Sequence, residues 1–266
     1  MLINELIKYD IYSPWIISIL VFAGFLVGFI NTLAGSGTII SYSIFMALGL
    51  PASYANGTIR VGVIMQTLAA SLTFKKGSVL DVRKGVKLGI PTVIGSIVGA
   101  QIAVQINQDV FEYFVGAVMV LMLVFLFLKP QEWIVSKEGK TNEIHYFWQF
   151  LIYFLIGIYG GFIHIGVGIF LLAALVLISG YDLLRANALK VFVVLLYSPF
   201  ALVVYMYNDH IHYGLALISS IGNVFGGLLA SRIAISWGTK FIHYFLIIII
   251  ILFTAKTFGV FNFIIY

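Results

Sequence analysis

Cysteine and charge are the two things that this sequence has least of. The 266 residues include no cysteine, and only 9% of them are Asp, Glu, Lys or Arg. The absence of cysteine excludes disulfide bonds and thiol chemistry. Soluble domains average roughly 25% charged residues, so a chain this poor in charge could not cover a surface exposed to water.

Hydrophobic residues take the place of the missing charges and make up 62% of the chain. No Asp, Glu, Lys or Arg occurs between Ile11 and Ile59. We therefore predict an all-α polytopic membrane protein with 8–10 transmembrane segments, folded as a single integral domain over residues 1–266. The start of the chain shows none of the features of a cleaved signal peptide, so we expect none. The net charge of +5 is expected to set membrane topology and does not indicate a nucleic-acid partner.

Eight apolar runs are close to the length of about 20 residues that crosses a bilayer. Two shorter runs, 37–50 and 166–179, each follow a glycine-rich interruption. They are short for a span, which leaves tilted spans, half helices or re-entrant hairpins as alternatives. The eight predicted spans are 14–33, 57–74, 86–106, 110–128, 146–165, 189–208, 213–230 and 241–260.

The chain repeats itself after 131 residues. Gly35 falls on Gly166, Gly37 on Gly168, and Asn56 on Asn187. Each half therefore opens with an apolar helix that is broken by glycines. We expect a first repeat at 14–128, a cytoplasmic linker at 129–145 and a second repeat at 146–262. Paired broken segments at corresponding positions of two halves are a strong sequence indication of a transport site.

Loop charges predict that the two repeats have opposite orientations. The loop at 75–87 is rich in Lys and Arg and is expected in the cytoplasm, whereas its counterpart at 208–213 has neither residue. The next pair is reversed, since Asp109 and Glu112 lie in one loop, and Arg232 and Lys240 in the other. An inverted repeat with five crossings per half and both termini outside fits best. If the short runs 37–50 and 166–179 did not cross the membrane, the chain would have eight crossings and a parallel repeat. The loop charges disfavour this alternative.

The first break, at 31–38, has the composition of an anion site. A helix that stops inside a membrane exposes N–H and C=O groups, which are tolerated where protein or a ligand binds them. Free N–H groups at a helix start attract anions, and Ser36 or Thr38 could cap the new helix. The alternative is a helix crossing that needs small residues. Because the break recurs, we assign substrate binding to Asn31, Gly35, Ser36, Gly37 and Thr38.

The second break contributes His164, Gly166 and Gly168 to the same predicted site. His164 lies opposite Asn31 in the repeat. It could donate a hydrogen bond to an anion or carry a coupling proton, because histidine titrates near neutral pH. The alternative is a hydrogen-bonded histidine with a purely structural role.

A second matched element follows each short run. Asn56 and Asn187 are predicted to cap the next helices and are included in the binding site. Arg60 is the only cation inside the apolar part of the first half, and Lys190 is one position from its counterpart. Intramembrane charges face a bundle interior or a wet cavity and indicate ligand paths. Snorkelling to the surface is the alternative for Arg60, and a topology signal is the alternative for Lys190.

Packing motifs occupy matching places in the two halves. Gly95 and Gly99 form a Gly-x-x-x-Gly pattern, and Gly222 and Gly226 form another. Small residues four positions apart let two membrane helices approach closely. We expect these patterns to be helix contacts.

The segments GFINTLAGSGT and GLPASYANGTIRV, with the basic loop and the GSIVGA helix that follow, resemble the TauE/SafE sulfite exporter family. The second half, with GGFIHIGVGIF and RANALKV, is similar to that family's second repeat. Two departures are Ser36 and Val167, which interrupt the glycine runs usual in the family. The resemblance implies a bacterial or archaeal transporter for sulfur-containing anions such as sulfite, sulfonates or sulfoacetate, for which proton coupling is often proposed.

The function predicted from the sequence is therefore secondary transport of a small sulfur oxyanion across the plasma membrane, with protons as a candidate coupling ion and no enzymatic activity, cofactor or metal. A transporter or channel for another solute is the first alternative. It would want acidic groups within the membrane, whereas all ten Asp and Glu lie in predicted loops or termini. A remote alternative is an intramembrane hydrolase with Ser36 as nucleophile and His164 as base.

Overall fold

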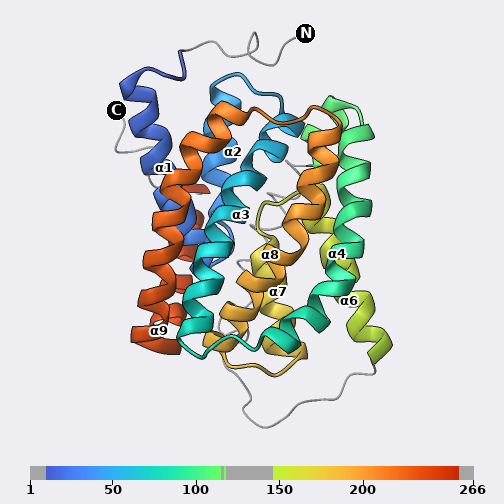
Figure 1. Ribbon diagram of the computed structural model, residues 1–266, viewed down its shortest axis with the longest axis vertical. Coiled ribbons are helices and arrows are strands. Elements are labelled where there is room, and N and C mark those ends of the chain that lie inside the picture. The colour runs from blue at the N-terminus through green and yellow to red at the C-terminus, as the bar shows by residue number, and fades with distance from the viewer. Residues whose placement is uncertain (1–9, 115–116, 118–145, 258–266) are drawn as a thin grey trace.

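The computed structural model describes residues 10–114, 117 and 146–257, and within these residues it is built from helices and turns alone (Figure 1). The all-α fold expected from the sequence is thereby confirmed. The predicted linker at 129–145, most of the predicted span at 110–128 and the end of the span at 241–260 lie outside the described residues.

Local capping sets where several helices begin. The side chain of Ser13 accepts a bond from the backbone N–H of Ile16, and Pro14 follows at the first helical position, both typical of a helix start. Asp81 accepts from the N–H of Lys84 at 3.0 Å and starts the fourth helix. The helices of the first half are α1 (Pro14–Leu33), α2 (Thr38–Ala47), α3 (Ala52–Lys76) and α4 (Val82–Gln105).

The second half follows the same pattern. Asp182 accepts from the N–H groups of Leu184 and Arg185 at the start of α8. The last helix changes direction at Gly238, whose φ of 69° is outside the helical region. The elements are α6 (Tyr146–Phe162), α7 (Val167–Ala173), a π-helical turn η2 (Ala174–Ile178), α8 (Leu183–Tyr207) and α9 (Tyr213–Thr257).

Five helices of the described chain are long and apolar enough to cross a membrane. Three of them start earlier than predicted, because α3 begins at Ala52, α4 at Val82 and α8 at Leu183. Asn56 and Asn187 therefore lie inside helices, and the prediction that they cap them is wrong. Their buried polar neighbours lower the local hydropathy, which places an apolar run too late in the sequence. The five long helices are Pro14–Leu33, Ala52–Lys76, Val82–Gln105, Leu183–Tyr207 and Tyr213–Phe245.

The short segments form hairpins with the helices before them. In Figure 1, α1 descends from the upper end and α2 leads back to that end, whereas α6 rises from the lower end and α7 leads back down. At 1.5 Å per residue, the 10 residues of α2 reach about half of a 30 Å hydrocarbon core. A hairpin that returns to its own side gives the next helix the same direction as two full crossings would. Hairpins of this kind are therefore compatible with opposite orientations of the halves.

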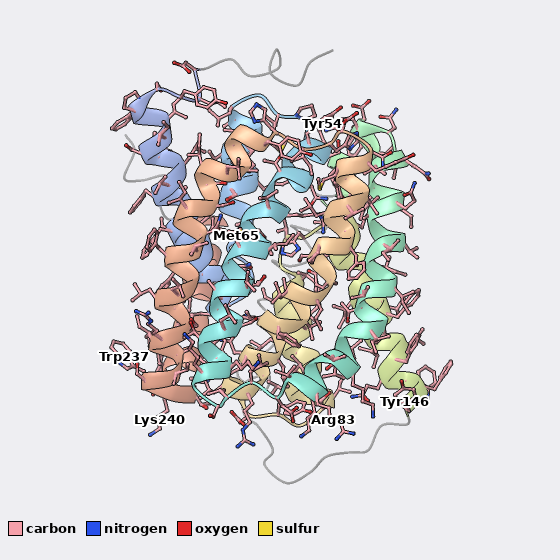
Figure 2. All side chains as sticks on the ribbon, viewed as in Figure 1. Tyr54, Met65, Arg83, Tyr146, Trp237 and Lys240 are labelled. Atoms are coloured by element: carbon pink, nitrogen blue, oxygen red, sulfur yellow. The ribbon has the colours of Figure 1, made fainter. Side chains whose placement is uncertain are left out.

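The repeat is visible in backbone geometry. Helices α3 and α8 each have 25 residues and begin 131 positions apart. They end in equivalent turns, at Ser78 and Asp209, which have the same φ of 57° and are the positive-φ non-glycine residues of the described chain. Figure 2 places Tyr54 at the upper end of the bundle, and Arg83 and Lys240 at the lower end.

Glycine contacts join each hairpin to the other half. A Cβ on Gly99 of α4 would overlap the carbonyl oxygen of Ile158 in α6, and one on Gly226 of α9 would overlap that of Phe25 in α1. Gly95 and Gly222 meet the same two helices. The expected role of the Gly-x-x-x-Gly patterns is confirmed. Each pattern holds α1 or α6 against a helix from the opposite half.

We predict that Gly99→Ala lowers the stability of the protein, whereas Gly89→Ala in the same helix is tolerated. The new methyl group at 99 meets rigid backbone of α6, while at 89 it meets only the end of the Leu196 side chain, 2.5 Å from the ideal Cβ position. Overpacking of this kind costs roughly 1–3 kcal/mol. Thermal unfolding of the two variants in detergent measures the difference, and equal melting temperatures would contradict it.

We predict that cysteines placed at Ser78 and Asp209 react from opposite faces of the membrane. Both turns are exposed, and the chain has no native cysteine that would interfere. Labelling with a membrane-impermeant maleimide in sealed, oriented vesicles tests this. Reaction of both positions from one side would refute the inverted arrangement.

Candidate functional site

The two breaks lie against each other in the interior of the protein. Gly35 and Gly166 both have positive φ, 80° and 72°, which glycine adopts without strain. A Cβ on Gly35 would lie 2.5 Å from the Cα of Gly168. Only hydrogen atoms fit between the two backbones, so no other residue could occupy position 35 without separating them.

Arg60 of α3 binds the broken end of α6. Its guanidinium donates from Nη1 to the carbonyl of Gly160 at 3.2 Å and from Nη2 to that of Gly161 at 2.5 Å. It also lies 4.6 Å from the centre of the Tyr205 ring. Arg60 is 0% exposed, so the alternative that it snorkels to the surface is wrong.

Asn56 completes the closure of the second break. Its Nδ2 donates to the carbonyl of Phe162 at 2.7 Å and contacts the hydroxyl of Tyr205 at 2.6 Å. Its Oδ1 accepts from the backbone N–H of His164 at 3.3 Å. The amide thus spans the interruption, binding the last carbonyl of α6 and an N–H group two residues later.

Lys190 of α8 does for α1 what Arg60 does for α6. Its ammonium donates to three carbonyl oxygens in the last turn of α1, those of Asn31 at 3.3 Å, Thr32 at 2.9 Å and Leu33 at 3.4 Å. Lys190 is 1% exposed. It is therefore a buried partner of the first break, and the alternative of a topology signal at the membrane surface is wrong.

The two cations form a reciprocal arrangement, in which each half supplies the positive charge that stabilises the interrupted helix of the other. The last carbonyls of a helix have no intrahelical partner, and an unsatisfied polar group in a bilayer costs several kcal/mol. The end of a helix carries roughly −0.5 charge. A positive side chain therefore lies against the negative end of each interrupted helix.

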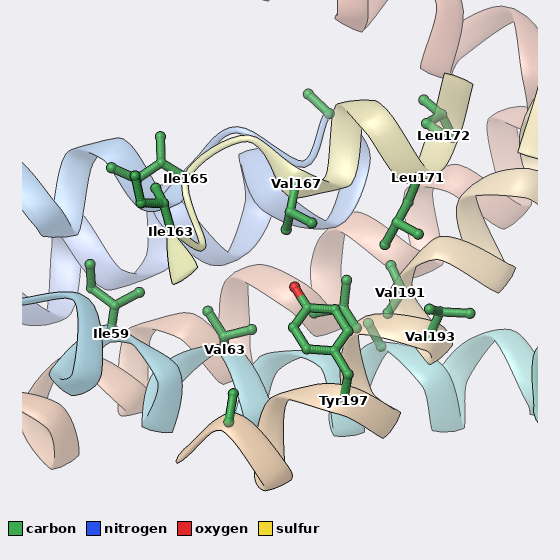
Figure 3. Close-up of a cluster of buried hydrophobic side chains, with 14 of the residues drawn as sticks. Ile59, Val63, Ile163, Ile165, Val167, Leu171, Leu172, Val191, Val193 and Tyr197 are labelled. Atoms are coloured by element: carbon green, nitrogen blue, oxygen red, sulfur yellow. The ribbon is translucent and has the colours of Figure 1, made fainter. Parts of the chain in front are cut away.

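His164 is oriented by a tyrosine from the neighbouring helix. Its Nδ1 lies 3.1 Å from the hydroxyl of Tyr197 in α8, and Figure 3 shows this side chain pointing toward the segment of Ile163, Ile165 and Val167. His164 is 1% exposed, and Tyr197 is 0% exposed. Apolar side chains of α3, α7 and α8 lie around Tyr197 (Figure 3), which strengthens any electrostatic interaction there.

Asn31 is engaged within the first half. Its Nδ2 donates to Oε1 of Gln66 at 3.4 Å, and Nε2 of Gln66 donates to the hydroxyl of Thr32 at 3.1 Å. The side chains of Asn31 and Gln66 thus link α1 to α3 just before the break. Asn31 keeps its backbone carbonyl for Lys190.

Several buried polar atoms around the breaks have no hydrogen-bond partner among the described residues. They belong to residues that the sequence placed in the site. Because most buried polar groups in native proteins are paired, each one calls for an explanation. These atoms are Ser36 Oγ, Thr38 Oγ1, Arg60 Nε, His164 Nε2, and both Nδ2 and Oδ1 of Asn187. The expectation that Ser36 or Thr38 caps α2 is wrong, since Gly37 precedes α2 and no side chain caps it.

The buried charge of the described residues is positive. Arg60 and Lys190 are buried, whereas none of the described Asp and Glu side chains is. A buried cation without a carboxylate partner is costly unless dipoles compensate it, and here the helix ends do so only in part. The interior around the breaks therefore favours negative charge.

An aromatic cluster covers the site toward the upper end of the bundle. His210 lies in the turn between α8 and α9. The centre of its ring is 4.4 Å from the ring centre of Tyr54 and 6.5 Å from that of Tyr205. Burial lowers the pKa of His210, and the nearby Asp209 acts in the opposite direction. His210 is thus held as a neutral ring over Tyr205, which itself covers Arg60.

Comparison with known proteins identifies the family. The model of the family described as "Sulfite exporter TauE/SafE" matches residues 20–257. This chain belongs to the TauE/SafE family. The two breaks, Arg60, Lys190 and the contact of Gly35 with Gly168 all lie within the matched region.

Relatives of this TauE/SafE protein are named as membrane transporters. It is 23% identical to the probable membrane transporter protein ORF9 of Sinorhizobium sp, over 88% of this chain and 89% of the relative. It is 23% identical to YfcA of Escherichia coli K12, over 92% and 90%. For YunE of Bacillus subtilis the identity is 26%, over 88% and 94%. No solved structure matches the chain. The protein is a multi-pass membrane transporter of a small solute.

Sequence reasoning missed some residues that build this site. The sequence does not indicate Tyr197 and Tyr205 as site residues, because a tyrosine in an apolar run is an ordinary core residue. Lys190 was noticed only as an approximate counterpart of Arg60. A useful signal is that each cation follows a repeated asparagine at helical spacing, Arg60 after Asn56 and Lys190 after Asn187.

We predict that Lys190→Met destabilises the protein, and that Lys190→Arg does so far less. The methionine leaves the carbonyls of the last turn of α1 without a donor, and hydrogen bonds to a charged group contribute about 1.5–3 kcal/mol. The arginine retains both charge and donors. Thermal unfolding in detergent compares the three proteins. A methionine variant as stable as the parent would show that the cap is dispensable.

Proposed function

We propose that this TauE/SafE protein is a secondary transporter of a small sulfur-containing oxyanion, of the sulfite, sulfonate or sulfoacetate class. The observation that carries the proposal is the uncompensated positive charge beside the two breaks. Arg60 and Lys190 are buried there, and no described carboxylate is buried with them. A cation would be repelled from this interior, and a neutral solute would gain nothing from its charge.

The first break supplies direct contacts for such an anion. The positive end of the dipole of α2 lies at this break, where the N–H groups of Ile39 and Ile40 donate to the carbonyls of Ser36 and Gly37. Beside them lie the unpartnered hydroxyls of Ser36 and Thr38. Nε2 of His164 and Nε of Arg60, at the second break, are also unpartnered and would add donors when Nδ1 of His164 accepts from Tyr197. We assign these groups to substrate binding, with protonation of His164 as a candidate for coupling to a proton gradient.

The proposed mechanism depends on inverted repeats, 14–128 and 146–262, joined by a cytoplasmic linker at 129–145. The hairpins that enter from opposite ends (Figure 1) and the contact of Gly35 with Gly168 support this arrangement. Rocking of one repeat against the other about the meeting point of the breaks would open the site to one side at a time. The bacterial relatives favour the plasma membrane of a bacterium or archaeon.

We predict that the purified protein, reconstituted into liposomes, transports at least one anion among sulfite, sulfate, thiosulfate and organosulfonates. Uptake of each solute is measured against empty liposomes. Choline and glucose serve as matched cationic and neutral solutes, and neither should be transported. Transport of choline or glucose without any oxyanion would overturn the proposal.

We predict that Arg60→Gln weakens binding of the transported anion about 10–150-fold, since a charged hydrogen bond contributes about 1.5–3 kcal/mol. Arg60→Lys, which retains the charge, is the control, and thermal unfolding verifies that both variants fold. Unchanged affinity in Arg60→Gln would make the cation purely structural.

We predict that His164→Asn removes the pH dependence of transport in the liposome uptake assay. An unchanged pH profile in this variant would exclude His164 as the proton carrier.

A further inference from the structure

The two repeated asparagines have opposite environments. Asn56 uses its amide fully, binding Phe162, Tyr205 and the N–H of His164. Asn187, at the equivalent position of α8, is 0% exposed, yet neither its Nδ2 nor its Oδ1 has a partner among the described residues. A buried amide with both groups unpaired is costly, and its twin shows that the position can be satisfied.

The reason for the difference lies in how the two broken helices end. At the end of α6, the carbonyl of Phe162 and the N–H of His164 are left for Asn56. At the end of α1, the N–H of Gly35 already donates to the carbonyl of Asn31 at 2.9 Å, and the carbonyl of Leu33 already receives Lys190. The last carbonyl of α1 and the N–H two residues after it, which correspond in position to the partners of Asn56, therefore already have hydrogen-bond partners.

Asn187 lies on the side of α8 that carries Lys190. It lies three residues before Lys190, and residues three apart share one face of a helix. Lys190 reaches the last carbonyls of α1, as Arg60 and Asn56 together reach those of α6. The first break is also where the hydroxyls of Ser36 and Thr38 have no partner.

We propose that Asn187 is the donor and acceptor contact of a substrate subsite at the first break, and that it selects an oxyanion that carries its own O–H or N–H group. This inference rests on the proposed function, because it specifies which oxyanions the site accepts. It also gives the two asparagines different tasks. Asn56 binds protein groups at the second break, and Asn187 contacts the ligand at the first.

The selection follows from the chemistry of an amide. Nδ2 donates and Oδ1 accepts. A fully deprotonated oxyanion offers only acceptors, so it satisfies Nδ2 and leaves Oδ1 buried and unpaired. An oxyanion with a hydroxyl or amino group satisfies both atoms. Sites built to hydrogen-bond such a group discriminate strongly against analogues that lack it.

The test compares two ligands of nearly equal size, 2-hydroxyethanesulfonate and propane-1-sulfonate, in which a methyl group replaces the hydroxyl. Binding to the purified full-length protein is measured by calorimetry. The wild type should bind the hydroxy compound at least about tenfold more tightly. Asn187→Leu should lose this preference, and Asn187→Ser, which retains a donor and an acceptor, should keep part of it.

Ser198→Ala is the matched control. Ser198 lies on the same helix, is 0% exposed and has an unpartnered hydroxyl, but it is three turns beyond Asn187. This variant should keep the wild-type preference. Equal binding of the two sulfonates by the wild type, binding of neither, or a preference that survives in Asn187→Leu would overturn the inference. Transport of oxyanions without preference would leave the proposed function intact, whereas transport of no oxyanion would refute that function itself.

Discussion

The carbonyl groups at the ends of two interrupted helices are the constraint on which this structure depends. Inside a bilayer there is no water to bind them, so each end requires a donor from the protein. The donors are long cationic side chains that enter from the opposite half, Lys190 at α1 and Arg60 at α6. The glycine contacts of α4 and α9 hold both hairpins at the distance these bonds require. Topology, packing and charge thus serve one requirement.

The same requirement makes the buried charge of the described residues positive. A full charge placed on a partial one leaves a remainder, and in the described residues no carboxylate is buried to cancel it. The proposed preference for anions would therefore follow from how the broken helices are stabilised.

The sequence predicted the helical architecture, the repeat and the positions of both breaks, because each depends on local composition. Glycine clusters and apolar runs are visible without knowledge of the fold. The prediction from sequence placed Asn56 and Asn187 at helix starts, because hydropathy does not account for polar residues that are buried by packing. It could not show what Arg60 and Lys190 bind, since their partners are backbone carbonyls about 100 and 160 positions away in the chain, and carbonyls have no sequence signature. The unequal environments of the two asparagines also depend on three-dimensional contacts alone.

The reciprocal caps have a consequence for assembly. Neither half contains the cation that its own broken helix needs, so a half synthesised alone would insert with an uncapped helix end. It could be completed only by a second unit whose cation reaches across to its broken helix. The single chain thus joins covalently two units, each of which carries the cation that the other needs.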